Sequence, residues 1–323
     1  MLVFSESAVA NPKDIASRLG IDFLVTEDSL ARIGASDRER TRILWIRFTS
    51  IVTEEILSSF KSLEVIVTTT TGLTHLAMPE IRRRGIDVVS LSHPNTSAIE
   101  NVSATAEHAW SLIQDSQYPA LNRSCIWSSR ESSIVHFERS RQLLGQTLGI
   151  VGFGRLGRKV ATYGIAFGMR VIALEPRPEP KSSSPNVQFV DDLRWLISEA
   201  DVVSLHASYQ EGSSPIITDS ILQPGKPELV LVNTARAELV DEKAILLALE
   251  ENRLSVYAAD VFEGDFDETA GGELKRSWSE NIHGSRFRLT PHVAGACLES
   301  YSLVEEVLIS RLRSTLLAKN FLT

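Results

Sequence analysis

Short apolar runs alternate with amphipathic segments along the first hundred residues. Extended runs such as Leu2–Phe4, Ile43–Ile46 and Val65–Val67 are separated by segments with helical spacing, such as Pro12–Leu19. Short, continuously apolar runs are typical of strands covered on both faces, and their alternation with helices predicts a parallel sheet. The other predicted elements of this part are Asp22–Val25, Thr53–Phe60, Pro79–Arg84 and Ile86–Leu91.

The same alternation begins again near residue 148 and predicts a second parallel sheet. Leu156–Phe167 and Asp241–Asn252 have the spacing of amphipathic helices, and Asn101–Ile113 is a helical candidate that connects the two series. The polar stretches Gln117–Ser140 and Phe266–His283 are predicted to be loops. Buried strands are predicted at Leu148–Val151, Val171–Leu174, Val202–Leu205, Leu229–Val232 and Val256–Ala259.

Composition narrows the class of protein without naming a function. A length of 323 residues predicts about two domains, and 43% apolar with 23% charged residues is typical of a soluble globular protein. The excess of 41 acidic over 33 basic residues argues against a general binder of polyanions such as nucleic acids and leaves a local basic patch open.

The sequence also gives expectations about cellular location and metal binding. Cys125 and Cys297 cannot form a disulfide framework, no apolar run is long enough to span a membrane, and Met1–Glu6 lacks the start of a secretory signal. The histidines show no metal-ligand spacing. We therefore expect a cytoplasmic protein without a membrane partner or a metal.

A glycine-rich loop is the sharpest local signal. Gly152, Gly154 and Gly157 form a G-x-G-x-x-G pattern between a predicted strand and a predicted helix. In this context the first glycine permits a tight turn, the second lets the backbone approach a pyrophosphate, and the third lets the helix pack on the strand. The pattern predicts dinucleotide binding at the helix amino terminus.

An acidic residue and a neighbouring arginine bear on the choice of dinucleotide. Glu175 follows the loop at about the 20-residue spacing expected for the acid that binds the adenosine ribose, which favours NAD because a carboxylate repels a 2′-phosphate. Arg177 lies two residues further on and could pair with that phosphate. NAD is expected, and NADP stays open.

Several stretches beyond the loop occur in an order that resembles the D-isomer-specific 2-hydroxyacid dehydrogenase family. The resemblance covers about residues 60–300 and implies two Rossmann-like or flavodoxin-like α/β domains with parallel sheets. An NAD-binding domain of residues 101–294 would be inserted into a substrate domain made of residues 1–100 and 295–323. The active site would lie between them, and a homodimer is implied. The stretches are Leu148–Gly157, Asp201–His206, Leu231–Glu242, Asp260–Glu263 and Leu289–Gly295, with Arg84–Val88 and Thr105–His108 upstream.

The resemblance also implies a reaction, reversible hydride transfer between NAD(H) and the C2 carbon of a small 2-hydroxy or 2-oxo acid. Arg236 matches the arginine that holds the substrate carboxylate, and His292 matches the acid/base. Asp265 stands where relatives carry the glutamate that supports the histidine, and it is one methylene shorter. Glu263 is an alternative support from the same loop.

Binding residues follow from the same resemblance. Thr71, Gly72 and Leu73 match the loop that, together with Arg236, meets the substrate carboxylate, although the hydroxyl-rich run around them could equally be an ordinary strand exit. Cofactor contacts are implied for Gly152, Gly154, Arg155, Leu156, Gly157, Glu175, His206, Thr234, Ala235 and Asp260.

Two other functions stay open at this level. One is an NAD(H)-sensing binding protein with little turnover, comparable to the corepressors of the family. The other is a dehydrogenase of another small anion, such as formate or phosphite. Formate-oxidising relatives carry a neutral amide at the position of Asp265, which argues against that branch.

Overall fold

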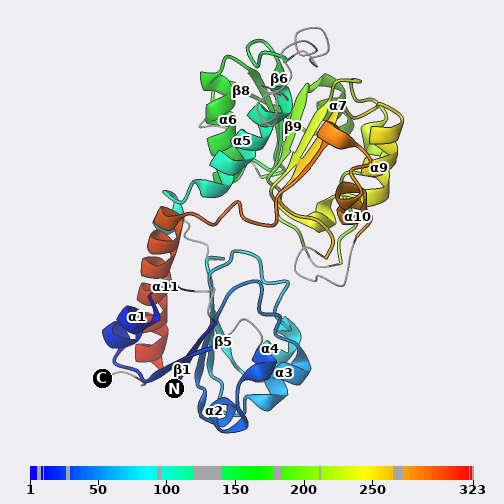
Figure 1. Cartoon of the computed structure of the whole chain (residues 1–323). Coiled ribbons are helices and arrows are strands. Elements are labelled where there is room, and N and C mark those ends of the chain that lie inside the picture. The colour runs from blue at the N-terminus through cyan, green and yellow to red at the C-terminus, as the bar shows by residue number, and fades with distance from the viewer. Residues whose placement is uncertain are drawn as a thin grey trace, which may run out of the picture. The chain divides into compact units, whose positions relative to one another are not determined.

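The computed structural model describes residues 1–5, 9, 11–26, 30–92, 97–118, 140–177, 184–210, 212–264, 272–319 and 321. Contacts divide the chain into two compact units (Figure 1). The terminal unit contains Met1–Val102 and Ala296–Thr323, and the central unit contains Ser103–Gly295. In its described residues each unit contains one parallel sheet, which confirms the predicted α/β class.

The terminal unit is built on a sheet that the structure describes with five parallel strands, in the spatial order β2-β1-β3-β4-β5. This is the order of flavodoxin-like sheets. In β3, Trp45 faces one apolar cluster and Leu44 the other, because successive strand residues point to opposite faces. The strands are β1 (Leu2–Ser5), β2 (Phe23–Thr26), β3 (Ile43–Ile46), β4 (Val65–Thr68) and β5 (Asp87–Val89).

Helices cover both faces of this sheet. The cluster on one face includes residues of α1 and α11, and the cluster on the other includes residues of α3 and α4. Arg18 of α1 donates two hydrogen bonds to Glu306 of α11, at 2.6 and 2.8 Å. The helices of this unit are α1 (Pro12–Leu19), α2 (Ala35–Arg40), α3 (Glu54–Ser59), α4 (Met78–Arg83) and α11 (Leu298–Ala318), with short 3-10 turns at Leu30–Arg32 and Ser97–Ile99.

The central unit contains a sheet described with seven parallel strands, in the order β12-β11-β10-β9-β6-β7-β8. Its strand order reverses between β6 and β9. In open α/β sheets, ligands bind outside the carboxyl ends of the strands at this point. The strands are β6 (Thr147–Val151), β7 (Arg170–Leu174), β8 (Val187–Val190), β9 (Val202–Leu205), β10 (Val230–Asn233), β11 (Val256–Ala259) and β12 (Phe287–Leu289).

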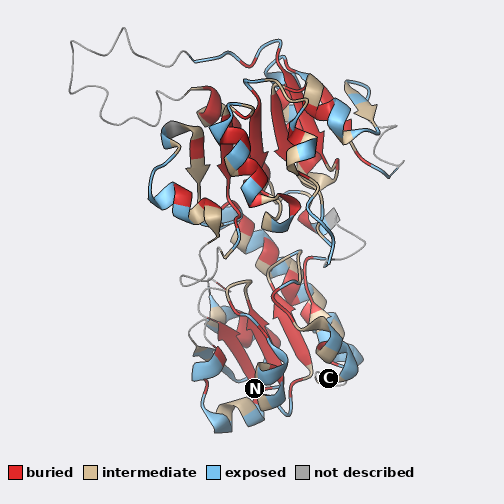
Figure 2. Ribbon diagram, turned by 90° about the vertical axis from the view of Figure 1, so that its right-hand side faces the viewer, coloured by how far each residue is buried: buried red, intermediate tan, exposed pale blue. Residues whose placement is uncertain are grey.

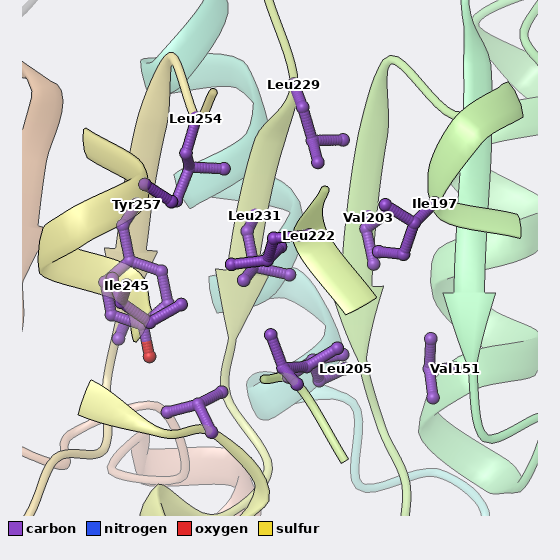
Figure 3. Packing of buried hydrophobic residues seen from close by; sticks show 14 of the residues in the cluster. Val151, Ile197, Val203, Leu205, Leu222, Leu229, Leu231, Ile245, Leu254 and Tyr257 are labelled. Atoms are coloured by element: carbon purple, nitrogen blue, oxygen red, sulfur yellow. The ribbon is translucent and has the colours of Figure 1, made fainter. Parts of the chain in front are cut away.

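This second sheet is also covered on both faces, so its inner strands are buried between partly exposed helices (Figure 2). Val202 packs in the cluster with α5 and α6, whereas Val203 packs in the cluster with α7, α8, α9 and α10 (Figure 3). The helices are α5 (Ala104–Gln117), α6 (Arg155–Ala166), α7 (Leu193–Glu199), α8 (Asp219–Leu222), α9 (Glu242–Glu250) and α10 (Glu273–Ser279), with 3-10 turns at Ala237–Leu239 and Gly284–Arg286.

Some sequence predictions need correction. Phe266–His283 is not a continuous loop, because it contains α10, which buries Leu274 in the core cluster. The helix expected at Asn101–Ile113 begins at Ala104 and continues to Gln117. Most of the predicted loop Gln117–Ser140 lies outside the described residues. The elements α2, α7, α8, α11, β8 and β12 were not predicted.

Candidate active site

The glycine loop follows β6 and adopts a backbone that side chains would block. Gly152 has φ +93°, and a Cβ there would lie 2.5 Å from the backbone nitrogen of Ala207. A Cβ at Gly157 would lie 2.2 Å from the carbonyl oxygen of Gly152. At Gly154 the nearest atom to a Cβ is Nη2 of Arg177, at 3.6 Å. The first and third glycines are thus required by packing, while the second leaves space beside the loop.

The helix that follows the loop presents its amino end without a side-chain cap. Gly154 is the N-cap of α6, and no acidic residue occupies the first turn, which begins at Arg155. The first N–H groups of a helix lack intrahelical partners and carry a partial positive charge, so they suit an anion. Leu156 packs against the apolar cluster, so its side chain serves the core.

Glu175 lies directly after β7, beside the loop, and is only 3% exposed. Its Oε2 accepts a hydrogen bond from the backbone N–H of Phe153 at 2.9 Å. The guanidinium of Arg177 forms an ion pair with the same carboxylate, with Nε at 2.8 Å from Oε1. These donors, that of Arg177 foremost, lower the pKa of Glu175 below its usual value.

His206 follows β9, on the other side of the point where the strand order reverses. Its backbone N–H donates to the carbonyl of Val151 at 2.7 Å, which holds it beside the start of the glycine loop. Its Nε2 pairs with the Ser204 hydroxyl at 2.9 Å, and its Nδ1 is buried with no partner among the described residues. Burial lowers the pKa of His206 to about 4, so the ring is neutral at neutral pH.

A second buried polar atom lacks a partner at the same edge of the sheet. The hydroxyl oxygen of Thr234, directly after β10, has no hydrogen bond within the described part of the chain. Buried polar atoms are usually satisfied, so such atoms are expected where a ligand completes the site. Together with the glycine cradle, Thr234 and His206 fit a bound dinucleotide at this edge.

Arg236 lies in a turn that Asn233 braces from inside the protein. The Asn233 amide donates to the carbonyl of Arg236 at 2.9 Å and accepts from the N–H of Ala235 at 3.0 Å. Nη1 of Arg236 donates to the Ala235 carbonyl at 2.6 Å. Because Asn233 is fully buried at the end of β10, the position of the arginine is set by the sheet.

His292 lies in the turn after β12 with φ +53°, a conformation that non-glycine residues rarely adopt. Its backbone N–H donates to the carbonyl of Asp260 at 2.9 Å. Asp260 is a buried residue, with 1% of its surface exposed. Its carboxylate accepts hydrogen bonds from the backbone N–H groups of Val293 at 2.9 Å and Ala294 at 2.8 Å. One buried aspartate therefore holds the backbone at the histidine and at the two residues that follow it.

A threonine and a second histidine complete this network. The Thr290 hydroxyl donates to Oδ1 of Asp260 at 2.5 Å and lies 2.9 Å from Nε2 of His108, on α5. The same His108 nitrogen is 3.6 Å from Oδ1 of Asp260. The sequence assigned no role to either Thr290 or His108. Their positions in two of the stretches that carried the resemblance were the available signal.

The predicted support for His292 is not settled by the described residues, because Asp265 lies outside them. Glu263 has an exposed side chain. The backbone N–H groups of Glu263 and Leu274 donate to the two carboxylate oxygens of Glu242, at 2.8 and 3.1 Å. Burial raises the pKa of Glu242. This carboxylate thus fixes both flanks of the segment that contains Asp265.

The candidate substrate loop Thr71–Leu73 belongs to the terminal unit. The Thr70 hydroxyl donates to the carbonyl of Gly72 at 2.6 Å and pairs with the Thr68 hydroxyl at 3.0 Å. Nε2 of His75 lies 3.1 Å from the same Thr68 hydroxyl. Two hydroxyls of the run therefore shape the turn, while Thr71 itself is exposed.

Among the described residues, no helix combines the length and apolar character needed to cross a bilayer. The His, Cys, Asp and Glu side chains in the described part of the chain form no group of three suited to holding a metal ion.

Comparison with known proteins finds a matching family and relatives that are dehydrogenases or reductases. The D-isomer specific 2-hydroxyacid dehydrogenase NAD binding domain matches residues 120–294. Hydroxypyruvate reductase of Thermotoga maritima is 29% identical over 270 residues, which covers 84% of this chain and 83% of that protein. (S)-Sulfolactate dehydrogenase of Chromohalobacter salexigens is 28% identical over 313 residues, or 96% and 95% of the two chains.

A solved structure with the same fold carries a bound dinucleotide. The D-lactate dehydrogenase of Aquifex aeolicus, complexed with NAD and lactic acid, matches with a TM-score of 0.81 at 23% identity, over 98% of this chain and 96% of that one. At this identity the likeness shows the fold. The central unit is a Rossmann fold of an NAD-binding family.

Proposed function

Because the chain belongs to the D-isomer-specific 2-hydroxyacid dehydrogenase family, we propose that it interconverts a small 2-hydroxy acid and its 2-oxo acid with NAD(H). Members of this family are NAD-dependent oxidoreductases. When bound, the nicotinamide supplies or accepts the hydride at C2 of the substrate. The protein must hold the substrate carboxylate and move one proton at the C2 oxygen.

One observation supports this function more than any other. The backbone N–H of Asp260 donates to the carbonyl of Asn233, and the N–H of His292 donates to the carbonyl of Asp260, at 3.0 and 2.9 Å. Since β10, β11 and β12 are neighbours, these bonds join the turn with Arg236 to the turn with His292 at the carboxyl edge of one sheet. The turns that carry Arg236 and His292 are thereby joined to one another across neighbouring strand ends.

Each side chain has a role that suits its chemistry. The Arg236 guanidinium binds the carboxylate through parallel charge-assisted hydrogen bonds. His292 gives its proton to the C2 oxygen during reduction and takes it back during oxidation, since histidine is the side chain that most often serves as a general acid and base. Asp265 supports the charged form of His292, and Glu242 holds the flanks of its segment.

The remaining assignments concern substrate and assembly. Thr71, Gly72 and Leu73 supply backbone donors to the substrate. The named relatives act on hydroxypyruvate, sulfolactate and D-lactate. We therefore assign this chain a three-carbon 2-oxo acid. We also propose a cytoplasmic homodimer that binds neither nucleic acid nor membrane.

The test measures NADH oxidation with pyruvate, hydroxypyruvate, glyoxylate and sulfopyruvate as substrates. Formate and phosphite are tested in the opposite direction, by the reduction of NAD. Turnover with a 2-oxo acid is expected, and Arg236→Gln should raise KM roughly 100-fold because charged hydrogen bonds are lost. Arg170→Gln is the control, since Arg170 pairs with Glu199 at the amino end of β7. Tight NADH binding without turnover of any acid would favour the NAD(H)-sensing function instead.

A further inference from the structure

The carboxylate of Glu175, which is expected to bind the adenosine ribose, already accepts a full set of hydrogen bonds within the protein. A carboxylate offers about four acceptor positions. Oε1 of Glu175 accepts from the backbone N–H and Nε of Arg177, at 3.1 and 2.8 Å. Oε2 accepts from Nη2 of Arg177 and from the N–H of Phe153, both at 2.9 Å. Four donors therefore fill the positions that ribose hydroxyls would use.

Arg177, and not Glu175, is the member of the ion pair that is accessible to a ligand. Its side chain is 67% exposed, whereas the carboxylate beneath it is 3% exposed. Its Nη2 lies beside the glycine loop, 3.6 Å from the place of a Cβ on Gly154. A dinucleotide whose pyrophosphate lies on this loop would bring its adenosine ribose to the arginine before it reached Glu175.

The ion pair changes the charge that a ligand meets. An isolated carboxylate would repel a 2′-phosphate, but the paired guanidinium neutralises it and lies on the outer side. Arginine is permanently charged and has the donor geometry that suits a phosphate. Hydrogen bonds from Arg177, the largest cause, lower the pKa of Glu175, so the pair stays ionised at neutral pH.

We infer that Arg177 is a specificity-determining residue that caps Glu175 and allows the site to bind NADP(H) as well as NAD(H). The 2′-phosphate of NADP(H) contacts the guanidinium. With NAD(H), the ribose hydroxyls meet the same guanidinium or displace it to reach Glu175. The inference rests on the NAD-binding fold of the central unit and is independent of which acid the protein reduces.

The experiment measures binding without turnover. Dissociation constants of NADH and NADPH are determined by calorimetry, in the absence of any oxo acid, for the wild type, Arg177→Leu and Arg170→Leu. Arg170, the first residue of β7, is a matched control, because it is also paired with a glutamate, at 2.8 Å, and its loss changes the net charge equally. Thermal unfolding of all three proteins verifies that they are folded.

The wild type should bind NADPH within about tenfold of NADH. Arg177→Leu should weaken NADPH relative to NADH by at least about tenfold, as expected for loss of a charge-assisted hydrogen bond to phosphate. Arg170→Leu should leave the ratio unchanged. A ratio that responds less than this to Arg177→Leu, or equally to both variants, overturns the inference. Failure of the proposed reaction would instead appear as absent turnover with both coenzymes, while the binding ratio would still be measurable.

Discussion

The backbone N–H of His292 donates to the carbonyl of Asp260, and the carboxylate of Asp260 accepts from the two residues that follow the histidine. The histidine is thus held at φ +53° by a residue that directly follows the neighbouring strand β11. A positive φ costs free energy for a side chain with a Cβ, so the surrounding bonds must maintain it. Asp260 is therefore a positioning residue for the proposed acid/base.

Replacing Asp260 by asparagine should disrupt this position. The amide nitrogen of Asp260→Asn would face an N–H or O–H donor where the carboxylate now accepts. We expect a loss of about 2–3 kcal/mol in the free energy of unfolding, from a buried donor left unpaired. We also expect kcat to fall at least roughly 100-fold, since displaced catalytic groups lose alignment.

The measurements are urea unfolding and steady-state kinetics. Asp241→Asn is the control, because Asp241 caps α9 and asparagine is an equally good N-cap. Wild-type kcat in Asp260→Asn would refute the positioning role.

Thr290 offers a milder test of the same network. Thr290→Val keeps the shape but removes the hydroxyl that bonds Asp260 and His108. We expect kcat to fall about tenfold, by the roughly 1.5 kcal/mol that a hydrogen bond to a charged group contributes, with little change in KM. Thr290→Ser keeps the hydroxyl and should restore most of the activity. Equal losses in both variants would indicate a packing effect instead.

Gly154 and Gly157 of the glycine loop should respond differently to replacement by alanine. In Gly157→Ala the new Cβ meets the carbonyl of Gly152, so both stability and NADH affinity should fall. In Gly154→Ala the Cβ meets no atom closer than 3.6 Å and φ stays negative, so unfolding should be unchanged within about 1 kcal/mol. Its NADH affinity should still fall at least about tenfold, because the methyl group occupies the approach to the pyrophosphate. Calorimetry and urea unfolding separate the two effects, and unchanged affinity in Gly154→Ala would place the pyrophosphate elsewhere.

The lowered pKa of His206 predicts how the stability of the folded protein depends on pH. Its pKa is about 4 in the folded protein and 6.5 in the reference state, so the unfolded chain takes up the proton first as the pH falls. Stability from the neutral ring is complete above pH 6.5 and is lost between 6.5 and 4, by at most about 3 kcal/mol. Urea unfolding across this range should show a steeper decline for the wild type than for His206→Gln. Parallel curves would show that the ring titrates equally in both states.

The core strands could be predicted because buried parallel strands are continuous apolar runs. Ile43–Ile46, Val202–Leu205 and Val256–Ala259 have their predicted bounds. The outer strands β8 and β12 have polar or charged centres, Gln188 and Arg288, and edge positions do not require an apolar run. The helix α11 could have been predicted from its four-residue spacing of apolar residues. The buried residues with that spacing are Val304, Leu308, Leu312 and Leu316.

Some features of the candidate site could also be predicted from the sequence, whereas others could not. The sequence singled out the glycine loop because it follows a predicted strand, and it singled out Arg236 and His292 because each lies in a stretch that carries the family resemblance. The bonds between Asp260 and the turn of His292 join residues more than 30 positions apart, which local patterns do not encode. Arg177 raised the question of NADP from its sequence position, but only the structure places its guanidinium on Glu175.

The central claim is that His292 moves the proton in an NADH-dependent reduction of a 2-oxo acid. The most direct measurement is single-turnover oxidation of bound NADH by the best oxo acid, for the wild type, His292→Asn and the control His283→Asn. We predict that His292→Asn slows the reaction about 100- to 10,000-fold, the usual contribution of a general acid, with NADH affinity unchanged. His283→Asn should react like the wild type. A His292→Asn rate equal to that of the wild type would contradict the proposed mechanism.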